Sequence, residues 1–269
     1  MTLPSPGPDR ACLITGASSG IGADIARELA GRGHQVVLVA RSEEPLKALA
    51  QEIGSDSVPA HVLPTDLSDR AARAALLDRV TALGVTADVL VNNAGYSTLG
   101  KVAGADPDDE MAMTEVDVLA VQDLCTRMLP GMVERGRGAV LNVASTAAFQ
   151  PLPGQASYAA AKSFVLSYTL SLAGELSGTG VTATCLCPGP VKTGFADRAG
   201  FDEDDFDSAL PKMMWVTAGE VARYAVKELD KGSLVAIPGL ANQVGARFSQ
   251  VAPRRLLLEI LKRMHPALK

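Results

Sequence analysis

The chain has 269 residues, of which 47% are hydrophobic and 20% are charged, and its formal net charge is -5. This length suits one α/β domain with a large core, and the acidic balance gives no reason to expect nucleic acid as a partner. No apolar run approaches the length of a membrane span, and the proline-rich residues 1–10 lack the apolar stretch of a signal peptide. We therefore expect a cytoplasmic protein with a flexible N-terminal tail.

The first apolar run, residues 11–14, leads into a glycine-rich turn at 15–22 and then into a helical pattern at 23–30. A helix N-terminus presents unpaired N–H groups and a partial positive charge, which suits a diphosphate. Gly16 is expected to take the tight turn, Gly20 to let phosphates approach, and Gly22 to let the helix pack closely. Because the spacing is G-x-x-x-G-x-G and not G-x-G-x-x-G, this turn alone is also compatible with a plain tight loop.

Strands and helices alternate along the rest of the chain. Further strands are expected at 35–40, 58–63, 88–91, 138–143, 181–186 and 233–237. Helices are expected at 43–53, from 68 or 69 to about 83, and at 107–134, 156–176 and 217–229. This order predicts the α/β class: a single domain, residues 11–240, with a Rossmann-type doubly wound parallel β-sheet flanked by helices. Ligands of such sheets bind beyond the carboxyl ends of the strands, where Arg41, Asp66 and Ser145 fall.

The end of the second strand bears on cofactor choice. A dinucleotide fold that prefers NAD usually has an acid there, whereas this chain has Arg41 and Ser42. A guanidinium suits a ribose 2′-phosphate, and a hydroxyl adds a hydrogen bond, so we expect NADP(H) over NAD(H). Glu43 and Glu44 follow directly and argue against this preference, and a solvated arginine at a helix start is the alternative.

Tyr158 and Lys162 are four residues apart on one predicted helix, so their side chains share a face. An ammonium at about 6 Å, with an effective dielectric near 20, would stabilise the phenolate by roughly 3 kcal/mol, about two pKa units. This would make Tyr158 a general acid/base, and Ser145 could hydrogen-bond a substrate carbonyl oxygen. A tyrosine packed against the aliphatic part of a lysine is the plain alternative.

Together these motifs resemble the short-chain dehydrogenase/reductase family. The matching residues, in order, are 15–22, Asp66, 92–95, Ser145, 158–162 and 188–193. With Arg41 and Ser42, the residues expected to bind the cofactor are Gly16, Ser18, Ser19, Gly20, Ile21, Gly22, Asp66, Leu67, Asn93, Ala94, Gly95, Tyr158, Lys162, Pro188, Gly189, Val191 and Thr193.

The resemblance also implies individual roles. Asp66 and Leu67 would flank the adenine, and Asn92 would shape the cofactor pocket. Lys162 would bind the nicotinamide ribose, and Thr193 the carboxamide. Tyr158 would pass a proton to the substrate oxygen as hydride reaches its carbon, with Ser145 as its catalytic partner.

One position departs from the family pattern. The family usually has an asparagine in the helix before the Ser145 strand, where it holds a water in a proton relay to the lysine, and this chain has Asp117 there. An ionised carboxylate accepts hydrogen bonds but cannot donate them, and near Lys162 it would oppose formation of the tyrosinate. We expect Asp117 to keep a relay with a shifted pH optimum; slowed or lost activity is the alternative.

Residues 195–216 have no clean periodicity and combine phenylalanines, methionines and Trp215 with an acidic cluster. In the family this segment covers the substrate, so we expect a lid over an apolar carbonyl or alcohol. The expected pocket walls are Tyr96, Phe149, Leu152 and Gln155.

The chain continues past the usual family core as a C-terminal extension, residues 241–269. A helix starting near Pro253 would be amphipathic and basic. We expect it to pack on its own core or on a partner subunit; contact with a membrane surface is the alternative. The cysteines and histidines lack metal-ligand spacing, so we expect buried thiols and no metal site.

These features predict an NADP(H)-dependent oxidoreductase acting on an apolar carbonyl or alcohol. The family resemblance implies assembly as a homodimer or homotetramer through the long helices around Asp117 and Tyr158. A non-catalytic or weakly active NADP(H)-binding sensor or scaffold is the competing class, and Asp117 is the feature that supports it. An epimerase or dehydratase is a third option without a signal of its own.

Overall fold

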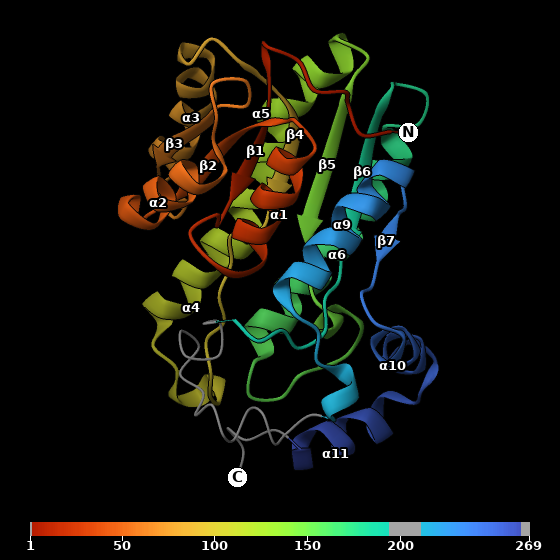
Figure 1. Cartoon of the computed structure of the whole chain (residues 1–269). Coiled ribbons are helices and arrows are strands. Elements are labelled where there is room, and N and C mark those ends of the chain that lie inside the picture. The colour runs from red at the N-terminus through yellow and green to blue at the C-terminus, as the bar shows by residue number, and fades with distance from the viewer. Residues whose placement is uncertain (1, 194–210, 265–269) are drawn as a thin grey trace.

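The structure is a computed structural model that describes residues 2–193 and 211–264, and within them seven parallel strands form one sheet (Figure 1). The strands are β1 (Arg10–Thr15), β2 (Gln35–Ala40), β3 (Ala60–Pro64), β4 (Thr86–Asn92), β5 (Gly138–Val143), β6 (Val181–Leu186) and β7 (Val235–Ala236). Their spatial order is β3-β2-β1-β4-β5-β6-β7, which reverses direction between β1 and β4. The predicted doubly wound parallel sheet is confirmed, and this reversal is where such a fold binds its ligand.

Helices cover both faces of the sheet because alternate residues of each strand point to opposite sides. On one face lie α1 (Gly20–Gly31), α2 (Glu43–Ile53) and α9 (Ala218–Lys231), whose buried residues share one hydrophobic cluster with Cys12 and Ile14 of β1. On the other lie α3 (Arg70–Ala82), α5 (Ala120–Glu134) and α6 (Ala156–Glu175), whose buried residues share a second cluster with Ala11 and Leu13. The continuous apolar character of the strands therefore reflects burial on two sides.

The long helix expected at 107–134 is interrupted at its centre. It consists of α4 (Pro107–Thr114), the π-helical turn η2 (Glu115–Leu119) and α5, and Asp117 is a buried residue of that turn. A π-helical turn inserts one extra residue into the helix and commonly occurs at functional sites. The irregularity therefore falls at the position where the sequence departs from the family pattern.

The chain before β1 makes specific contacts, in contrast to the loose tail that its composition suggests. The Thr2 N–H donates to the Asp230 carbonyl oxygen at 2.9 Å, and the Thr2 hydroxyl donates to the Leu229 carbonyl oxygen at 2.8 Å. The Gln35 side chain donates to the Pro8 carbonyl oxygen at 2.6 Å. Residues 2–9 thus connect the end of α9 to the start of the sheet.

The C-terminal extension forms two helices, α10 (Leu240–Val251) and α11 (Arg254–Met264), at the end of the molecule toward which the strands point (Figure 1). Of the predicted lid, only 211–216 are described; these include the short turn η4 (Lys212–Met214), and 195–210 lie outside the described residues. The four cysteines are buried free thiols. Among the helices described, none is both long and apolar enough to cross a bilayer.

Candidate active site

A cavity of about 450 Å³ lies beyond the carboxyl ends of the strands. Twenty-two of the residues that the sequence predicts for the site line it: Gly16, Ser18, Ser19, Gly20, Ile21, Arg41, Ser42, Asp66, Leu67, Asn93, Ala94, Gly95, Ser145, Tyr158, Lys162, Pro188, Gly189, Val191, Thr193 and the expected wall residues Tyr96, Leu152 and Gln155. Gly22 and Asp117 lie behind the lining. One continuous cavity therefore joins the expected nucleotide site to the expected catalytic residues.

The glycine turn is held against the end of β4. Gly16 has a φ of 65°, and a Cβ on it would lie 2.7 Å from Asn93 Nδ2. Asn93 Nδ2 also donates to the Thr15 carbonyl oxygen at 3.0 Å, and the Thr15 hydroxyl accepts from the Asn93 and Ala94 N–H groups. A Cβ on Gly22 would collide with the Gly16 carbonyl oxygen. The turn therefore requires glycine at both positions, as the sequence predicts.

The N-terminus of α1 opens toward the cavity. Gly20 and Ile21, its first two residues, line the cavity, and its first turn contains no acidic residue. Gly20 has a φ of 58°, and a Cβ there would lie 3.1 Å from Thr193 Cγ2, so Thr193 sits over the turn. Backbone N–H groups and the positive end of a 12-residue helix thus face a space that a diphosphate would fill. These residues fit a dinucleotide.

Arg41, Ser42 and Asp66 lie at the ends of β2 and β3 and line one side of the same cavity. Asp66 Oδ1 accepts from the Ser68 hydroxyl at 2.7 Å and from the Ser68 N–H at 2.9 Å. These hydrogen bonds, together with the charge of Arg41, lower the pKa of Asp66 despite partial burial. The carboxylate is therefore ionised at neutral pH and is held in a fixed orientation.

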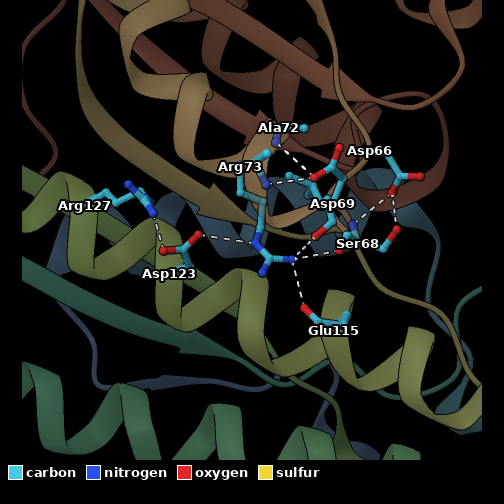
Figure 2. Close-up of polar contacts among 10 residues, drawn as sticks. Asp66, Ser68, Asp69, Ala72, Arg73, Glu115, Asp123 and Arg127 are labelled. Carbon is cyan, nitrogen blue, oxygen red and sulfur yellow. Dashed lines mark hydrogen bonds and ion pairs between the residues drawn. The ribbon is translucent and has the colours of Figure 1, made fainter.

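A buried arginine connects this loop to the π-helical turn (Figure 2). Arg73 Nη1 donates to the Leu67 carbonyl oxygen at 2.5 Å and pairs with Glu115 at 3.1 Å, while its Nε pairs with Asp123 at 3.3 Å. Asp123 also pairs with Arg127. Because Arg73 is only 3% exposed, its charge requires these partners. Arg73 therefore positions both Leu67, which lines the cavity, and the turn that carries Asp117.

Ser145, Tyr158 and Lys162 come together from two elements. Ser145 follows β5, whereas Tyr158 and Lys162 occupy one face of α6. Tyr158 is hydrogen-bonded to Ser145, and Lys162 Nζ lies 5.5 Å from the centre of the Tyr158 ring. Lys162 Nζ also donates to the Val143 carbonyl oxygen at 3.3 Å. A phenol, a hydroxyl and an ammonium therefore meet in one cavity wall.

Asp117 forms a direct ion pair with Lys162, with Oδ2 2.9 Å from Nζ. Its other oxygen, Oδ1, accepts from the Tyr96 N–H at 3.0 Å, and a Cβ on Gly95 would lie 2.9 Å from it. Both charged groups are buried, so each compensates the other in a poorly solvated position. The proximity to Lys162 that the sequence predicts for Asp117 is present.

The local electrostatics differ from the prediction made for Tyr158. Burial raises the pKa of the phenol above its ordinary value; Lys162 and the hydrogen bond with Ser145 lower it, and the negative charge of Asp117 raises it further. Asp117 also raises the pKa of Lys162, in spite of burial, so the ammonium persists. Lys162 thus acts on Tyr158 in the direction that the sequence predicts, but with the protein groups alone the pKa of Tyr158 is raised, because desolvation outweighs a lysine charge that Asp117 partly neutralises.

The wall residues are partly as expected. Leu152 and Gln155 line the cavity with Tyr96, but Phe149 does not and packs instead near Val121 and Val165. Asn92 also lies off the cavity: its side chain donates to Asn142 Oδ1 at 2.8 Å inside the core.

Several lining residues were not predicted from the sequence. Among them are Val116, Gln150 and Leu261, whereas Met214 belongs to the segment 195–216 that the sequence predicts as the lid. Only Leu261 had a usable signal, because it falls on the apolar face of a helix that had to cover something.

A glycine turn and a tyrosine–lysine pair in one cavity are the architecture of a nucleotide-dependent oxidoreductase. The family model described as short chain dehydrogenase matches residues 10–204. The chain therefore belongs to the short-chain dehydrogenase/reductase family.

Individual relatives agree with this assignment. A short chain dehydrogenase of Pseudocercospora fijiensis is 37% identical over 68% of this chain, and the match spans 60% of that relative. The NADP-dependent 3-hydroxy acid dehydrogenase YdfG of Salmonella typhi is 36% identical over 72% of this chain and 77% of its own length. Among solved structures, a short-chain dehydrogenase from Sphingobium yanoikuyae in complex with NADPH has a TM-score of 0.78 and 33% identity, and the match covers 88% of this chain and 93% of that one.

Proposed function

We propose that the protein is an NADP(H)-dependent oxidoreductase that moves hydride between the nicotinamide and an apolar carbonyl or alcohol. The observation that carries this proposal is the single cavity that has the open N-terminus of α1 at one end and Tyr158 with Ser145 and Lys162 at the other. A bound nucleotide would supply or accept the hydride at the substrate carbon. The chain itself has to supply the proton and the orientation.

In the reducing direction, Tyr158 donates its phenolic proton to the substrate oxygen while the Ser145 hydroxyl donates a hydrogen bond to the same oxygen. Lys162 stabilises the phenolate that results, because its ammonium lies over the Tyr158 ring at 5.5 Å. When bound, an oxidised nicotinamide would add its positive charge to this stabilisation of the phenolate. In the reverse direction the phenolate accepts the alcohol proton.

Asp117 acts through Lys162 and is therefore a positioning residue. Its carboxylate fixes the ammonium at 2.9 Å, and because it carries a negative charge it raises the pKa of Tyr158. We infer that this enzyme works with a more alkaline pH optimum than it would have with asparagine at this position.

The preference for NADP(H) rests on Arg41 and Ser42, which line the cavity at the end of β2 without an acid at that position. The NADP dependence in the name of the Salmonella relative and the NADPH complex of the Sphingobium neighbour support it. An apolar substrate is supported by Leu152, Met214 and Leu261 in the cavity wall.

The test is nucleotide oxidation by the purified full chain. NADPH or NADH is supplied with a panel of apolar ketones, aldehydes and acyl carbonyls, and with charged carbonyls of the same size. We expect oxidation of NADPH in preference to NADH with at least one apolar member. Tight NADPH binding without NADPH oxidation in the presence of any panel compound would favour a non-catalytic sensor or scaffold. This second candidate is supported by the ion pair with Asp117, which partly neutralises the charge of Lys162.

Assembly as a homodimer or homotetramer stays a prediction. Leu119 at the end of η2 and Phe164 and Leu170 on α6 are exposed apolar side chains on the long helices, and they support an interface there. The mass of the protein in solution, measured by light scattering, tests this prediction.

A further inference from the structure

On helix α10 the polar side chains face the protein and the apolar side chains face outward, which is the reverse of an ordinary surface helix. Its inner face is attached by polar groups: Asn242 Nδ2 donates to the Met214 and Pro238 carbonyl oxygens, and the Ser249 hydroxyl donates to Gln150 Oε1 at 2.8 Å. Its outer face is apolar, formed by Leu240, Val244, Phe248 and Val251. Leu240 is 76% exposed and Val251 is 82% exposed.

The spacing of these four residues aligns them in one stripe. Steps of four, four and three residues keep the side chains on a single face of a helix. That face is opposite to the one that carries Asn242, Ala246 and Ser249, which are buried. A surface helix normally buries its apolar face, so a four-residue apolar stripe directed outward indicates a docking surface.

Helix α11 extends the apolar surface and connects it to the cavity. Leu256, Leu258 and Ile260 are exposed, whereas Leu257 is buried and Leu261 lines the cavity. On α10, Ser249 is bonded to Gln150, which also lines the cavity. The two helices therefore contact the substrate end of the cavity from inside and present apolar side chains outside.

The charge of this surface is opposite to that of the whole chain. Between residues 240 and 262 the basic residues are Arg247, Arg254, Arg255 and Lys262, and Glu259 is the one acidic residue, on a chain of net charge -5. Basic side chains beside an apolar helix face are the combination that binds the surface of anionic membranes. A two-fold contact between copies of this surface would instead bring its basic residues together with few acids to pair with them.

We propose that the outer faces of α10 and α11 form a docking surface for an anionic lipid bilayer. The exposed apolar residues of both helices enter the interface between head groups and acyl chains, and the basic residues bind the anionic head groups. The cavity, whose wall includes Leu261, then lies beside the lipid phase in which an apolar carbonyl compound would concentrate. This docking can be measured without turnover, so its outcome is separate from that of the proposed activity.

Vesicle flotation of the full chain tests the proposal. We use vesicles of phosphatidylcholine alone and of phosphatidylcholine with phosphatidylglycerol, at low and at high salt. The expected result is binding to the phosphatidylglycerol vesicles that falls at least tenfold at high salt. The double variants Leu240→Gln/Phe248→Gln and Arg255→Gln/Lys262→Gln should each lower binding at least tenfold.

The matched control is Met111→Gln, which removes a 63% exposed apolar side chain on α4 and should leave binding unchanged. Circular dichroism and thermal unfolding of every variant establish that it is folded. Absence of vesicle binding by the wild type, or equal binding by wild type and both double variants, would overturn the proposal. So would a Leu240→Gln/Phe248→Gln variant that halves the mass in solution while the wild type ignores vesicles, because a second copy would then cover the surface.

Discussion

The two ends of the cavity are built differently. At the nucleotide end, backbone groups and small side chains of the turn before α1 face the cavity, with no acid in the first helical turn. At the reaction end, buried ionisable side chains from α6 and η2 contact one another, with Lys162 and Asp117 only 2.9 Å apart. The nucleotide end is thus specified by local shape, and the reaction end by tertiary packing and the energetics of buried charge.

The largest expected effect is a loss of kcat when the proton donor at the reaction end is removed and the nucleotide end is left intact. Tyr158→Phe keeps the ring and removes the proton donor, so kcat should fall about 1,000-fold, as is typical for loss of a general acid. The Kd for NADPH, measured by fluorescence titration, should change less than about threefold. Phe in place of Tyr168, a tyrosine elsewhere on α6 that does not line the cavity, is the control and should retain activity. Retained turnover in the Tyr158 variant would remove the proton role.

The next largest effect is expected from a substitution at the nucleotide end of the cavity, which should weaken NADPH binding. Gly16→Val places a branched side chain at a φ of 65° and 2.7 Å from Asn93 Nδ2, so NADPH binding should weaken about 100-fold, equivalent to about 3 kcal/mol. Gly84 has a φ of 77° with no atom within 4 Å of its expected Cβ. Gly84→Val therefore supplies backbone strain without crowding the cavity. If the two variants bind NADPH equally, the turn is not the diphosphate site.

A smaller effect on nucleotide binding is expected from changing Arg41, the residue that we expect to bind the ribose 2′-phosphate of NADPH. Arg41→Ala removes a charged donor that lines the cavity, and NADPH affinity should fall about tenfold while NADH affinity stays the same. Isothermal titration with both nucleotides measures this difference. Arg70→Ala, an exposed arginine away from the cavity, is the matched control. A variant with equal losses for both nucleotides would contradict the role of Arg41 in selecting the cofactor.

The smallest change is a displacement of the pH profile. Asp117→Asn removes the negative charge that raises the pKa of Tyr158. Alcohol oxidation needs the phenolate and increases as pH rises through this pKa, so the rising limb of kcat against pH should move to lower pH in the variant. Asp108→Asn, in the exposed first turn of α4, should leave the profile in place. An unchanged profile for Asp117→Asn, or a move to higher pH, would refute the positioning role.

The sequence predicts the nucleotide end of the cavity better than the reaction end, because the first depends on local shape and the second on tertiary packing and buried charge. The sheet, the glycine turn and the grouping of Gly16, Arg41 and Asp66 follow from periodicity and from the rule that parallel strands end at one edge. The Asp117–Lys162 distance depends on how η2 packs on α6, and the direction of the Tyr158 pKa depends on burial. Neither quantity is encoded in local spacing.

The structure also differs from the sequence-based prediction of the cavity wall at two residues, and in both cases tertiary packing is the cause. Phe149 follows the Ser145 turn, but a short 3-10 helix, residues Thr146–Phe149, directs it into the packing around Val165. Leu261 reaches the cavity through a helix more than 100 residues away in sequence from Ser145, so its place on an apolar helix face predicts burial but does not say that it is buried against this cavity.

The most direct test of the central claim is an experimental structure of the full chain with oxidised NADP and a slowly reacting apolar alcohol. The account predicts the diphosphate at the N-terminus of α1 and the alcohol oxygen within about 3 Å of both the Tyr158 hydroxyl and Ser145 Oγ. An alcohol oxygen bound away from Tyr158, or a diphosphate bound anywhere other than the turn before α1, would contradict it.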